Sequence, residues 1–419
     1  MIPRIPPPQS SLAPGEAPGR RARPKLVVFY AVLLLLIAMI LEVGSAMATA
    51  LLVRRGWMAW IPHSTPAQID YYFAHRNPLL GWGPPVDSAE RVVALQPRPD
   101  PAFPQTAPAC ASAYGESFTV GAEVGDDATY PHALGQIVGC RVANYGVGAY
   151  GSDQAWMLTG AQRHLDRAPV VILGHISENI LRNVNQYRNL LYPDQKLFFK
   201  PRFILEGDSL RRVPVPIQRR EDFERLERDP AAVLRYDVFL SRPRRGFPQS
   251  LTVLRWATQD FHVRAYLTGN PRHERFYHPD HPAGGLQLTS RILTTFAREA
   301  RAQGRFPFVV LVPVGRDFQY VMRTGRWPDQ PLADALRRAG VPLIHAGPPM
   351  LTRLKVEDPC HLFHDCSAHY NARGYRLLAE VVAERVGSTA KGVGASRPKP
   401  QFDRVRHQAR DIVSGSRQR

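Results

Sequence analysis

The sequence predicts an α/β fold with a mainly parallel sheet, preceded by one membrane-spanning helix near the N-terminus. Three observations support this prediction. The chain has 419 residues of which 44% are apolar, enough to bury a full core. A long apolar run lies near its start. After residue 101, short apolar strand-like runs alternate with amphipathic helix-like runs, a pattern typical of a parallel sheet covered on both faces.

Positive charge gathers at the two ends of the chain. The net charge of +18 comes from 54 Lys and Arg against 36 Asp and Glu, and residues 1–25 and 387–419 contribute +4 and +6 of it. Basic tails on a mildly basic body are typical of topology signals and solvated ends, not of a groove for phosphates. We therefore expect no nucleic-acid partner. The composition also excludes a fully disordered chain, a collagen and a small disulfide scaffold.

The first expected element is a transmembrane helix over residues 26–53. The run from Leu26 to Val53 contains one formal charge, Glu42. As a helix it would be about 42 Å long, enough to cross a bilayer with tilt. Lys and Arg are denser before this run than after it, which places the N-terminus in the cytoplasm. We expect a single-pass protein of the inner (cytoplasmic) membrane, with its main domain on the periplasmic or extracellular side.

Two features of this segment have competing interpretations. Ala46-Met47-Ala48 fits the small-x-small site of a cleaved signal peptide, but the apolar run continues through Val53, which favours an uncleaved signal anchor. Glu42 is costly inside a bilayer. It either marks a contact with another helix or lies near the outer headgroups, and we prefer the second interpretation.

The rest of the chain divides by composition. We expect a disordered N-terminus (1–25), an extended lead-in (54–100), a folded domain (101–386) with an insertion at about 185–285, and a basic disordered tail (387–419). Strands are expected at Ala111–Tyr114, Arg141–Tyr145, Val170–Gly174, Phe308–Pro313 and Pro342–Ala346. Helices are expected at Tyr130–Val138, Asp153–His164, Leu286–Gln303, Leu332–Ala339 and Ala372–Val386. The insertion holds a hairpin-like segment at 202–210 and a charged helix near 221–240.

All four cysteines lie beyond the expected membrane helix, where disulfides form. Four cysteines allow three pairings. Cys110 and Cys140 each start a strand-like stretch, whereas Cys360 and Cys366 share one loop. We expect Cys110–Cys140 and Cys360–Cys366.

Four short blocks follow strand-like runs or open the final helix. They are GESFTVG (115–121), NYGVGAYG (144–151), GHISEN (174–179) and DCSAHYNARGY (365–375). The carboxyl ends of parallel strands meet at one edge of a sheet, which is where open α/β sheets place their chemistry. We therefore expect the four blocks to meet at that edge.

Together, these blocks resemble the SGNH/GDSL hydrolase family, in particular its envelope-associated members, over roughly residues 78–386. The resemblance implies a three-layer α/β/α sandwich with Ser117 as the nucleophile and His369 as its general base. A serine hydroxyl is a poor nucleophile until an imidazole takes its proton. The alternative interpretation of Ser117 is an ordinary helix-capping serine, and the other three blocks argue against it.

The resemblance also implies an oxyanion hole. Its donors would be the backbone N–H groups of Ser117 and of the Gly148/Ala149 turn, together with the side-chain amide of Asn179. The tetrahedral intermediate of acyl transfer carries a negative oxygen that fixed donors stabilise. Ala149 stands where the family usually has glycine, so a Cβ would lie near the acyl group.

Other departures concern the acids. Glu116 replaces the usual Asp before the nucleophile. In the family the acid usually lies three residues before the histidine, and that position is Cys366 in this chain. Asp365, one residue earlier, is therefore the expected catalytic acid, with Asp358 or a backbone carbonyl as alternatives.

Two other motifs indicate different chemistry. Gly146–Gly151 fits G-x-G-x-x-G, but its candidate acid Asp166 precedes the following strand instead of ending it, contrary to a dinucleotide site. Cysteines and histidines between residues 360 and 369 could bind zinc, yet their spacing fits no standard ligand pair and a disulfide explains the cysteines more simply.

The sequence thus predicts a serine esterase that acts on ester-linked acyl groups of an envelope polysaccharide or lipid, with no metal or organic cofactor. An O-acyltransferase on the same substrates, a lipase at the membrane, and a catalytically degenerate glycan-binding or scaffold protein are the alternatives. The acyl donor, the acceptor, any protein partner and the oligomeric state stay open.

Overall fold

The computed structural model describes residues 24–55, 57–58, 61, 63–85, 95–192, 196–243, 245–355 and 357–395. Its centre is a five-stranded, all-parallel sheet in the order β2-β1-β3-β6-β7. The strands are β1 (Ala111–Gly115), β2 (Val142–Gly146), β3 (Val170–Ile176), β6 (Phe306–Val312) and β7 (Leu343–His345). All five coincide with predicted strands, because short β-branched and apolar runs between helices leave few other assignments.

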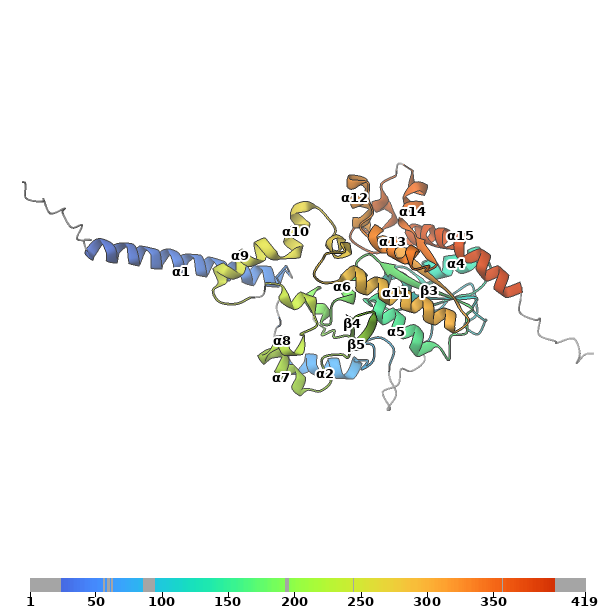
Figure 1. Ribbon diagram of the computed structural model, residues 1–419, viewed down its shortest axis with the longest axis horizontal. Helices are drawn as coiled ribbons and strands as arrows, with labels where there is room; N and C mark the ends of the chain where they lie inside the picture. The colour runs from blue at the N-terminus through green and yellow to red at the C-terminus, as the bar shows by residue number, and fades with distance from the viewer. Residues whose placement is uncertain are drawn as a thin grey trace, which may run out of the picture.

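Helices cover both faces of this sheet, which makes the domain a three-layer α/β/α sandwich as predicted (Figure 1). The face that includes Leu173 and Leu311 packs against α5, α11 and α13, and the face that includes Ile172 and Val310 packs against α4, α14 and α15. Successive strand residues point to opposite faces, so a strand buried on both sides is apolar throughout. These helices span Tyr130–Val138 (α4), Ser152–Gln162 (α5), Gly285–Ala302 (α11), Gln330–Arg338 (α13), Gly347–Leu354 (α14) and Ala372–Ala395 (α15).

Short helices occupy the strand ends at one edge of the sheet. They are α3 (Ser117–Val120) after β1, α6 (Asn179–Asn183) after β3 and α12 (Gly315–Thr324) after β6. Because the five strands are parallel, these three segments lie at the same edge.

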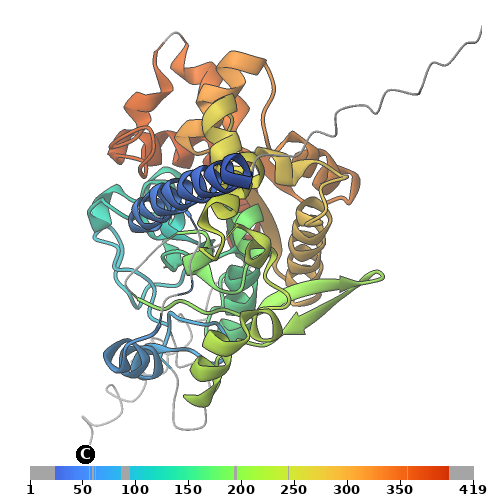
Figure 2. The same cartoon turned by 90° about the vertical axis from the view of Figure 1, so that its left-hand side faces the viewer.

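The chain between β3 and β6 contains elements that interrupt the alternation of strands and helices in the sheet domain. An antiparallel hairpin of β4 (Arg202–Glu206) and β5 (Ser209–Val213) projects from the body, as Figure 2 shows. It is followed by α7 (Glu221–Arg228), α8 (Pro230–Val233), α9 (Gln249–Gln259) and α10 (Phe261–Thr268). The charged helix expected near 221–240 therefore ends at Arg228, because the proline at position 230 removes a helix donor and disfavours helical backbone before it.

A buried ion pair holds this region to the sheet domain. Lys200 is almost completely buried, and its ammonium donates to Asp153 at 2.5 Å and to the backbone oxygens of Arg182 and Asn185. Removing one partner of such a pair leaves an uncompensated buried charge, so the contact fixes the position of the region on α5.

Two expected boundaries change in the structure. The lead-in at 54–100 contains a helix, α2 (Pro66–His75), which begins with a capping box between Thr65 and Gln68. The last helix, α15, continues to Ala395, beyond the expected start of the tail at 387. Of the segments expected to be disordered, 1–25 and 387–419, residues 1–23 and 396–419 lie outside the described residues, and residues 24 and 25 begin α1.

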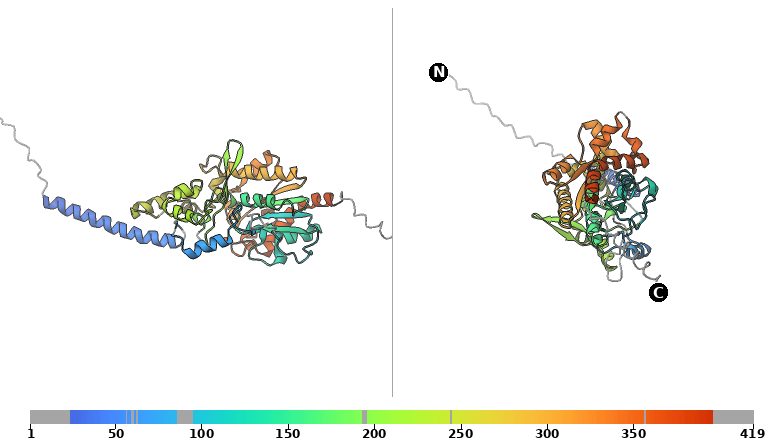
Figure 3. Two further views of the ribbon diagram at one scale, coloured as in Figure 1. Left: turned by 90° about the horizontal axis from the view of Figure 1, so that it is seen from below. Right: turned by 90° about the vertical axis from the view of Figure 1, so that its right-hand side faces the viewer.

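The N-terminal helix α1 (Pro24–Arg54) projects from the globular domain (Figures 1 and 3). By length and composition, Lys25–Arg54 is apolar enough to cross a membrane. Glu42 contacts another helix: its carboxylate accepts hydrogen bonds from the first residues of α9. The contact interpretation of Glu42 is therefore correct, and it was the one that the sequence made us rank second.

Both predicted disulfides are present, Cys110–Cys140 and Cys360–Cys366. The first joins the segments that lead into β1 and β2. The second closes a loop just before His369. Because both cysteines of the loop are oxidised, they are not available as thiolate ligands, which excludes the zinc site considered above.

Candidate active site

A cleft of about 1080 Å³ opens at the carboxyl edge of the sheet. Its wall contains Ser117 after β1, Gly148 and Ala149 after β2, Glu178 after β3, and His369 before α15. The four sequence blocks therefore meet in one place, because parallel strands end at a common edge.

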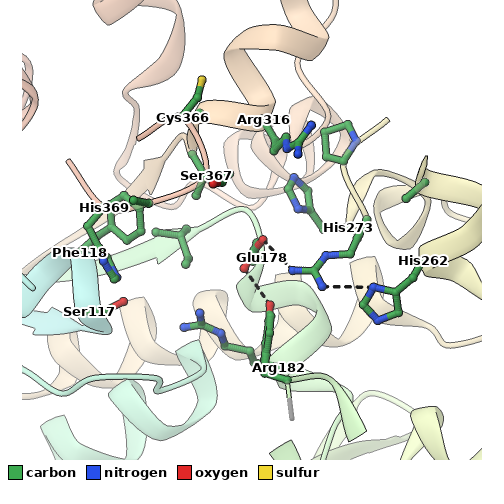
Figure 4. Close-up of a pocket in the computed structure, with 18 of the residues that line it drawn as sticks. Ser117, Phe118, Glu178, Arg182, His262, His273, Arg316, Cys366, Ser367 and His369 are labelled. Carbon is green, nitrogen blue, oxygen red and sulfur yellow. Dashed lines mark hydrogen bonds and ion pairs between the residues drawn. The ribbon is translucent and has the colours of Figure 1, made fainter. Parts of the chain in front are cut away.

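Ser117 lies at the first turn of α3, directly after β1, and is partly exposed in the cleft (Figure 4). The turn is tight: the N–H groups of Gly121 and Ala122 both donate to the Ser117 carbonyl. Gly121 ends it in a left-handed conformation, φ 81°, which glycine adopts without steric cost. The hydroxyl is thus presented from a short, well-ordered turn.

His369 lies at the same end of the cleft. Its ring packs on Phe118, with ring centroids 5.0 Å apart. Among the described residues, no hydrogen bond joins its imidazole to the Ser117 hydroxyl. Catalytic hydrogen bonds are often long before substrate binds, so the shared cleft wall is the relevant observation.

The acid that contacts His369 is Glu123, not Asp365. The His369 Nδ1 atom lies 3.2 Å from a Glu123 carboxylate oxygen, and this contact lowers the pKa of Glu123 below its ordinary value. Asp365 instead accepts hydrogen bonds from the backbone and hydroxyl of Ser367. Glu123 has a left-handed backbone, φ 69°, which is rare for a residue with a Cβ. Strain of this kind is frequent at functional sites.

Sequence reasoning missed Glu123 because it lies in the connection between α3 and α4, far from His369 in the chain. Its only local signal is its place just after the GESFTVG block. Asp358, the alternative acid, caps the 3₁₀ turn Pro359–Leu362 through the Cys360 N–H and is likewise committed elsewhere.

The Cys360–Cys366 loop sets the position of His369. A Cβ on Gly315 would lie 2.1 Å from the Cys366 carbonyl oxygen, so the loop lies directly on the turn after β6. The Gln319 side-chain amide, one turn into α12, donates to both sulfur atoms of the disulfide. The loop is therefore fixed against the sheet edge by a close backbone approach that only glycine allows.

The Gly148/Ala149 turn supplies two backbone N–H groups at the cleft wall. Among the described residues, no acceptor pairs with the N–H of Ser117, Gly148 or Ala149. Ala149 has a left-handed backbone, φ 66°, the conformation expected of the family's glycine. In the described part of the chain, the cleft wall therefore contains three unpaired backbone donors.

Asn179 lies behind the cleft wall. Its side-chain amide donates to the Glu116 carboxylate at 3.2 Å and to the Ser152 hydroxyl at 3.3 Å. Its carbonyl oxygen is buried and has no partner among the described residues. The predicted role of Asn179 as an oxyanion donor stays a prediction, and in this structure the amide contacts Glu116, the residue before Ser117.

Glu116, directly before Ser117, is completely buried. Burial raises its pKa to about 7, although Arg182 and the Asn179 amide act in the opposite direction. One of its oxygens has no hydrogen-bond partner among the described residues. A carboxyl group that changes charge near neutral pH therefore lies one residue from the proposed nucleophile.

Arginines outnumber carboxylates in the lining of the cleft, and Figure 4 labels two of them, Arg182 and Arg316. Four line it, against two carboxylates: Arg182, Arg188, Arg272 and Arg316, with Glu123 and Glu178. Burial would raise the pKa of Glu178, but Arg272, His273 and Arg182 outweigh it and lower the pKa to about 2. Glu178 is thus a fixed negative charge that orients Arg272, 3.7 Å away. The remaining positive charge favours an anionic ligand.

A buried network supports the far wall. The His273 Nε2–H group donates to one Asp317 oxygen at 2.6 Å, and the second Asp317 oxygen accepts from the Ser177 hydroxyl and the Val314 N–H. His273 and Asp317 are both buried, whereas His278 and Asp280 further along the same segment are exposed.

Asp166 does not serve a dinucleotide site. Its carboxylate accepts hydrogen bonds from the Tyr114 hydroxyl and from the Arg305 guanidinium, the latter at 2.6 Å. The acid of the G-x-G-x-x-G alternative is therefore part of the core.

Comparison with known proteins gives only distant similarity. No family model and no curated protein matches the chain. Among solved structures, a lipolytic protein of the G-D-S-L family from Veillonella parvula is 11% identical, with a TM-score of 0.31 over 65% of this chain and 96% of that one. An acetylxylan esterase from Geobacillus stearothermophilus is 11% identical, with a TM-score of 0.34 over 66% and 93%.

An α/β hydrolase from the Lake Arreo metagenome is likewise 11% identical, with a TM-score of 0.34 over 67% of this chain and 96% of its own. Of these three, the Veillonella protein is named for the family that the four sequence blocks resemble. At such scores the likeness carries no argument about activity or substrate. The functional case therefore rests on this chain's own residues.

Proposed function

We propose that the chain is a membrane-anchored serine acyl hydrolase with its active site outside the cytoplasm. Ser117 is the nucleophile, His369 the general base, and Glu123 the acid that orients the imidazole. The observation that carries this proposal is the His369–Glu123 pair in the same cleft wall as Ser117 and the unpaired backbone donors at Gly148 and Ala149.

The reaction follows from these positions. The Ser117 oxygen attacks the ester carbonyl carbon while His369 accepts the hydroxyl proton. The carbonyl oxygen becomes an oxyanion that accepts hydrogen bonds from backbone N–H groups of Ser117 and the Gly148/Ala149 turn. The intermediate collapses, the alcohol leaves with the proton from His369, and an acyl-serine remains. Water, activated by His369, then releases the carboxylic acid and restores Ser117.

A sugar hydroxyl in place of that water would give an O-acyltransferase on the same acyl-enzyme. The size of the cleft, about 1080 Å³, supports an extended substrate. Its arginines favour one that carries negative charge beside the ester, which suits an acidic envelope polysaccharide or a phosphate-bearing lipid. Two disulfides favour an oxidising compartment such as the periplasm.

A fluorophosphonate probe tests the proposal on the full chain in detergent, with intact mass as the readout. We expect one adduct on the parent and none on Ser117→Ala, while His369→Ala slows labelling by about 10² or more because the base is lost. Circular dichroism serves as the folding control for each variant.

The second candidate is a catalytically degenerate protein that binds acylated glycans. The absence of a Ser117–His369 hydrogen bond among the described residues favours it. A folded parent that takes no label while binding an acidic polysaccharide would replace the hydrolase proposal with this one.

A further inference from the structure

Helices α9 and α10 form a hairpin (Gln249–Thr268) that exposes large apolar side chains. Outside α1, twelve large apolar residues are exposed in the described chain, and five of them lie between residues 247 and 267. Their exposed fractions are 87% for Phe247, 39% for Leu251, 59% for Leu254 and 75% each for Tyr266 and Leu267. Such clustering on a soluble surface marks an interaction site.

The hairpin is docked on α1 (Figures 1 and 3). The Glu42 carboxylate accepts hydrogen bonds from the backbone N–H of Gln249 at 2.7 Å and of Ser250 at 3.1 Å, and from the Ser250 hydroxyl. Thr49 donates to the Gln249 side chain at 2.9 Å. The first residue of α9 follows a proline with no side-chain cap, so Glu42 of α1 satisfies the donors that a helix start leaves free.

This contact fixes the depth of the hairpin. The hydrocarbon layer is about 30 Å thick, which corresponds to about 20 helical residues. Lys25 prevents that layer from beginning before Leu26, so the earliest possible layer ends near Ser45. Glu42 then lies about 5 Å inside its outer boundary, and any later start or any tilt places it deeper. The beginning of α9 therefore lies at lipid depth, together with the exposed Phe247.

Aromatic side chains continue this surface toward the cleft. Trp57, just after α1, stacks on Trp256 of α9 with ring centroids 6.5 Å apart and contacts Tyr266 of α10 at 5.9 Å. Trp and Tyr prefer the membrane–water interface because their rings are apolar and their N–H or O–H groups stay hydrated. Trp57 and Tyr266 also line the cleft that contains Ser117.

We infer that the α9–α10 hairpin inserts into the outer leaflet of the membrane by the start of α9, with Phe247 just before it, and holds the mouth of the cleft against the lipid surface. The occupant of its apolar face is lipid. This inference rests on the proposed membrane anchor but not on the proposed chemistry. It places the reaction at the membrane surface, within reach of lipid-borne substrates.

Site-directed spin labelling of the full chain tests it in phosphatidylethanolamine–phosphatidylglycerol liposomes. All native cysteines are in disulfides, so a label attaches only to an introduced thiol. Phe247→Cys and Leu267→Cys probe the hairpin, Ile37→Cys probes α1, and Phe306→Cys, exposed at the opposite edge of the sheet, is the water control.

We expect the label at 247 to be more accessible to oxygen than to a nickel chelate, as at 37, and the label at 306 to show the reverse. The label at 267 keeps the test valid if the first variant misfolds. Lipid exposure at 37 with water exposure at 247 and 267 overturns the inference and leaves the anchor intact. Shielding of 247 and 267 from both reagents also overturns it, since a second protein copy would then cover the face. Water exposure at 37 overturns the anchor itself.

The Glu42→Ala variant tests the docking contact. Without the carboxylate, the first N–H groups of α9 lose their acceptor, so the label at 247 should move toward the chelate while the label at 37 stays in lipid. No change at 247 would show that Glu42 does not set the depth of the hairpin.

Discussion

Two carboxyl groups near Ser117 have opposite environments. Glu123 is half-exposed and paired with His369, which lowers its pKa, whereas Glu116 is completely buried and has a pKa raised to about 7. Environment thus separates the two: Glu123 is ionised at neutral pH and able to stabilise an imidazolium, and Glu116 changes charge there.

Glu123→Gln should slow fluorophosphonate labelling by about tenfold or more, because the amide no longer stabilises the positive His369. Asp365→Asn is the matched control, since its carboxylate contacts Ser367 and not the imidazole. Labelling rates of both variants decide between the two acids. A larger effect at Asp365 than at Glu123 would restore the assignment made from the sequence.

Glu116→Gln should change how stability depends on pH. The folded protein holds the Glu116 proton more tightly than the unfolded chain, whose group has the ordinary pKa of 4.5. This stabilisation is complete below that pKa and is lost as the pH rises to about 7, a change of about 3 kcal/mol.

Glutamine does not titrate, so the free energy of unfolding of Glu116→Gln minus that of the parent should rise by about 3 kcal/mol between pH 4.5 and pH 8. Denaturant unfolding in detergent measures it. Other titrating groups are shared by the two proteins and cancel. A difference that stays constant with pH would mean that Glu116 titrates normally.

At the scale of elements, the two disulfides have separate consequences. Cys110–Cys140 closes a segment of about 30 residues between the starts of β1 and β2, whereas Cys360–Cys366 closes a separation of 6 residues next to His369. Loop-closure entropy predicts a loss of about 4 kcal/mol when the first is removed and about 2 kcal/mol for the second.

Activity should follow the reverse order. Replacing Cys360 and Cys366 by serine frees the loop that holds His369 against Gly315, so it should reduce labelling more than the matched replacement of Cys110 and Cys140 in molecules that remain folded. Unfolding curves and labelling rates of the two double variants test this. Equal losses of labelling would show that the loop does not position the histidine.

At the scale of the whole molecule, the contacts of α1 bear on whether the anchor is retained. Glu42 and Thr49 lie on either side of the small-x-small site at Ala46–Ala48, and both contact the start of α9. Cleavage there would remove the acceptor that caps α9. We expect the chain purified from membranes to keep its first 48 residues, as measured by intact mass. A mature N-terminus at residue 49 would identify a signal peptide. The hairpin would then lack the α1 contact that sets its depth in the membrane.

The sequence by itself determined the central sheet, five of the six helices that cover it (α14 was not expected), the apolar N-terminal helix and both disulfide pairs. A local sequence pattern predicts each of these features. The pattern is either an apolar run whose length and period match one element, or cysteines placed at the starts of strands or within one loop. The four blocks at the strand ends converge as expected, because parallel connectivity leaves them no other edge.

Only the tertiary structure decided which acid contacts His369, where the Asn179 amide points, and that Glu42 caps α9. These contacts join residues far apart in the chain. In each of them, tertiary packing decides which donor or acceptor becomes the partner of the side chain. Glu123 reaches His369 from a left-handed turn, and Glu42 reaches Gln249 from another helix. Local sequence patterns do not predict such pairs, because burial and hydrogen-bond partners are decided only when the layers pack together.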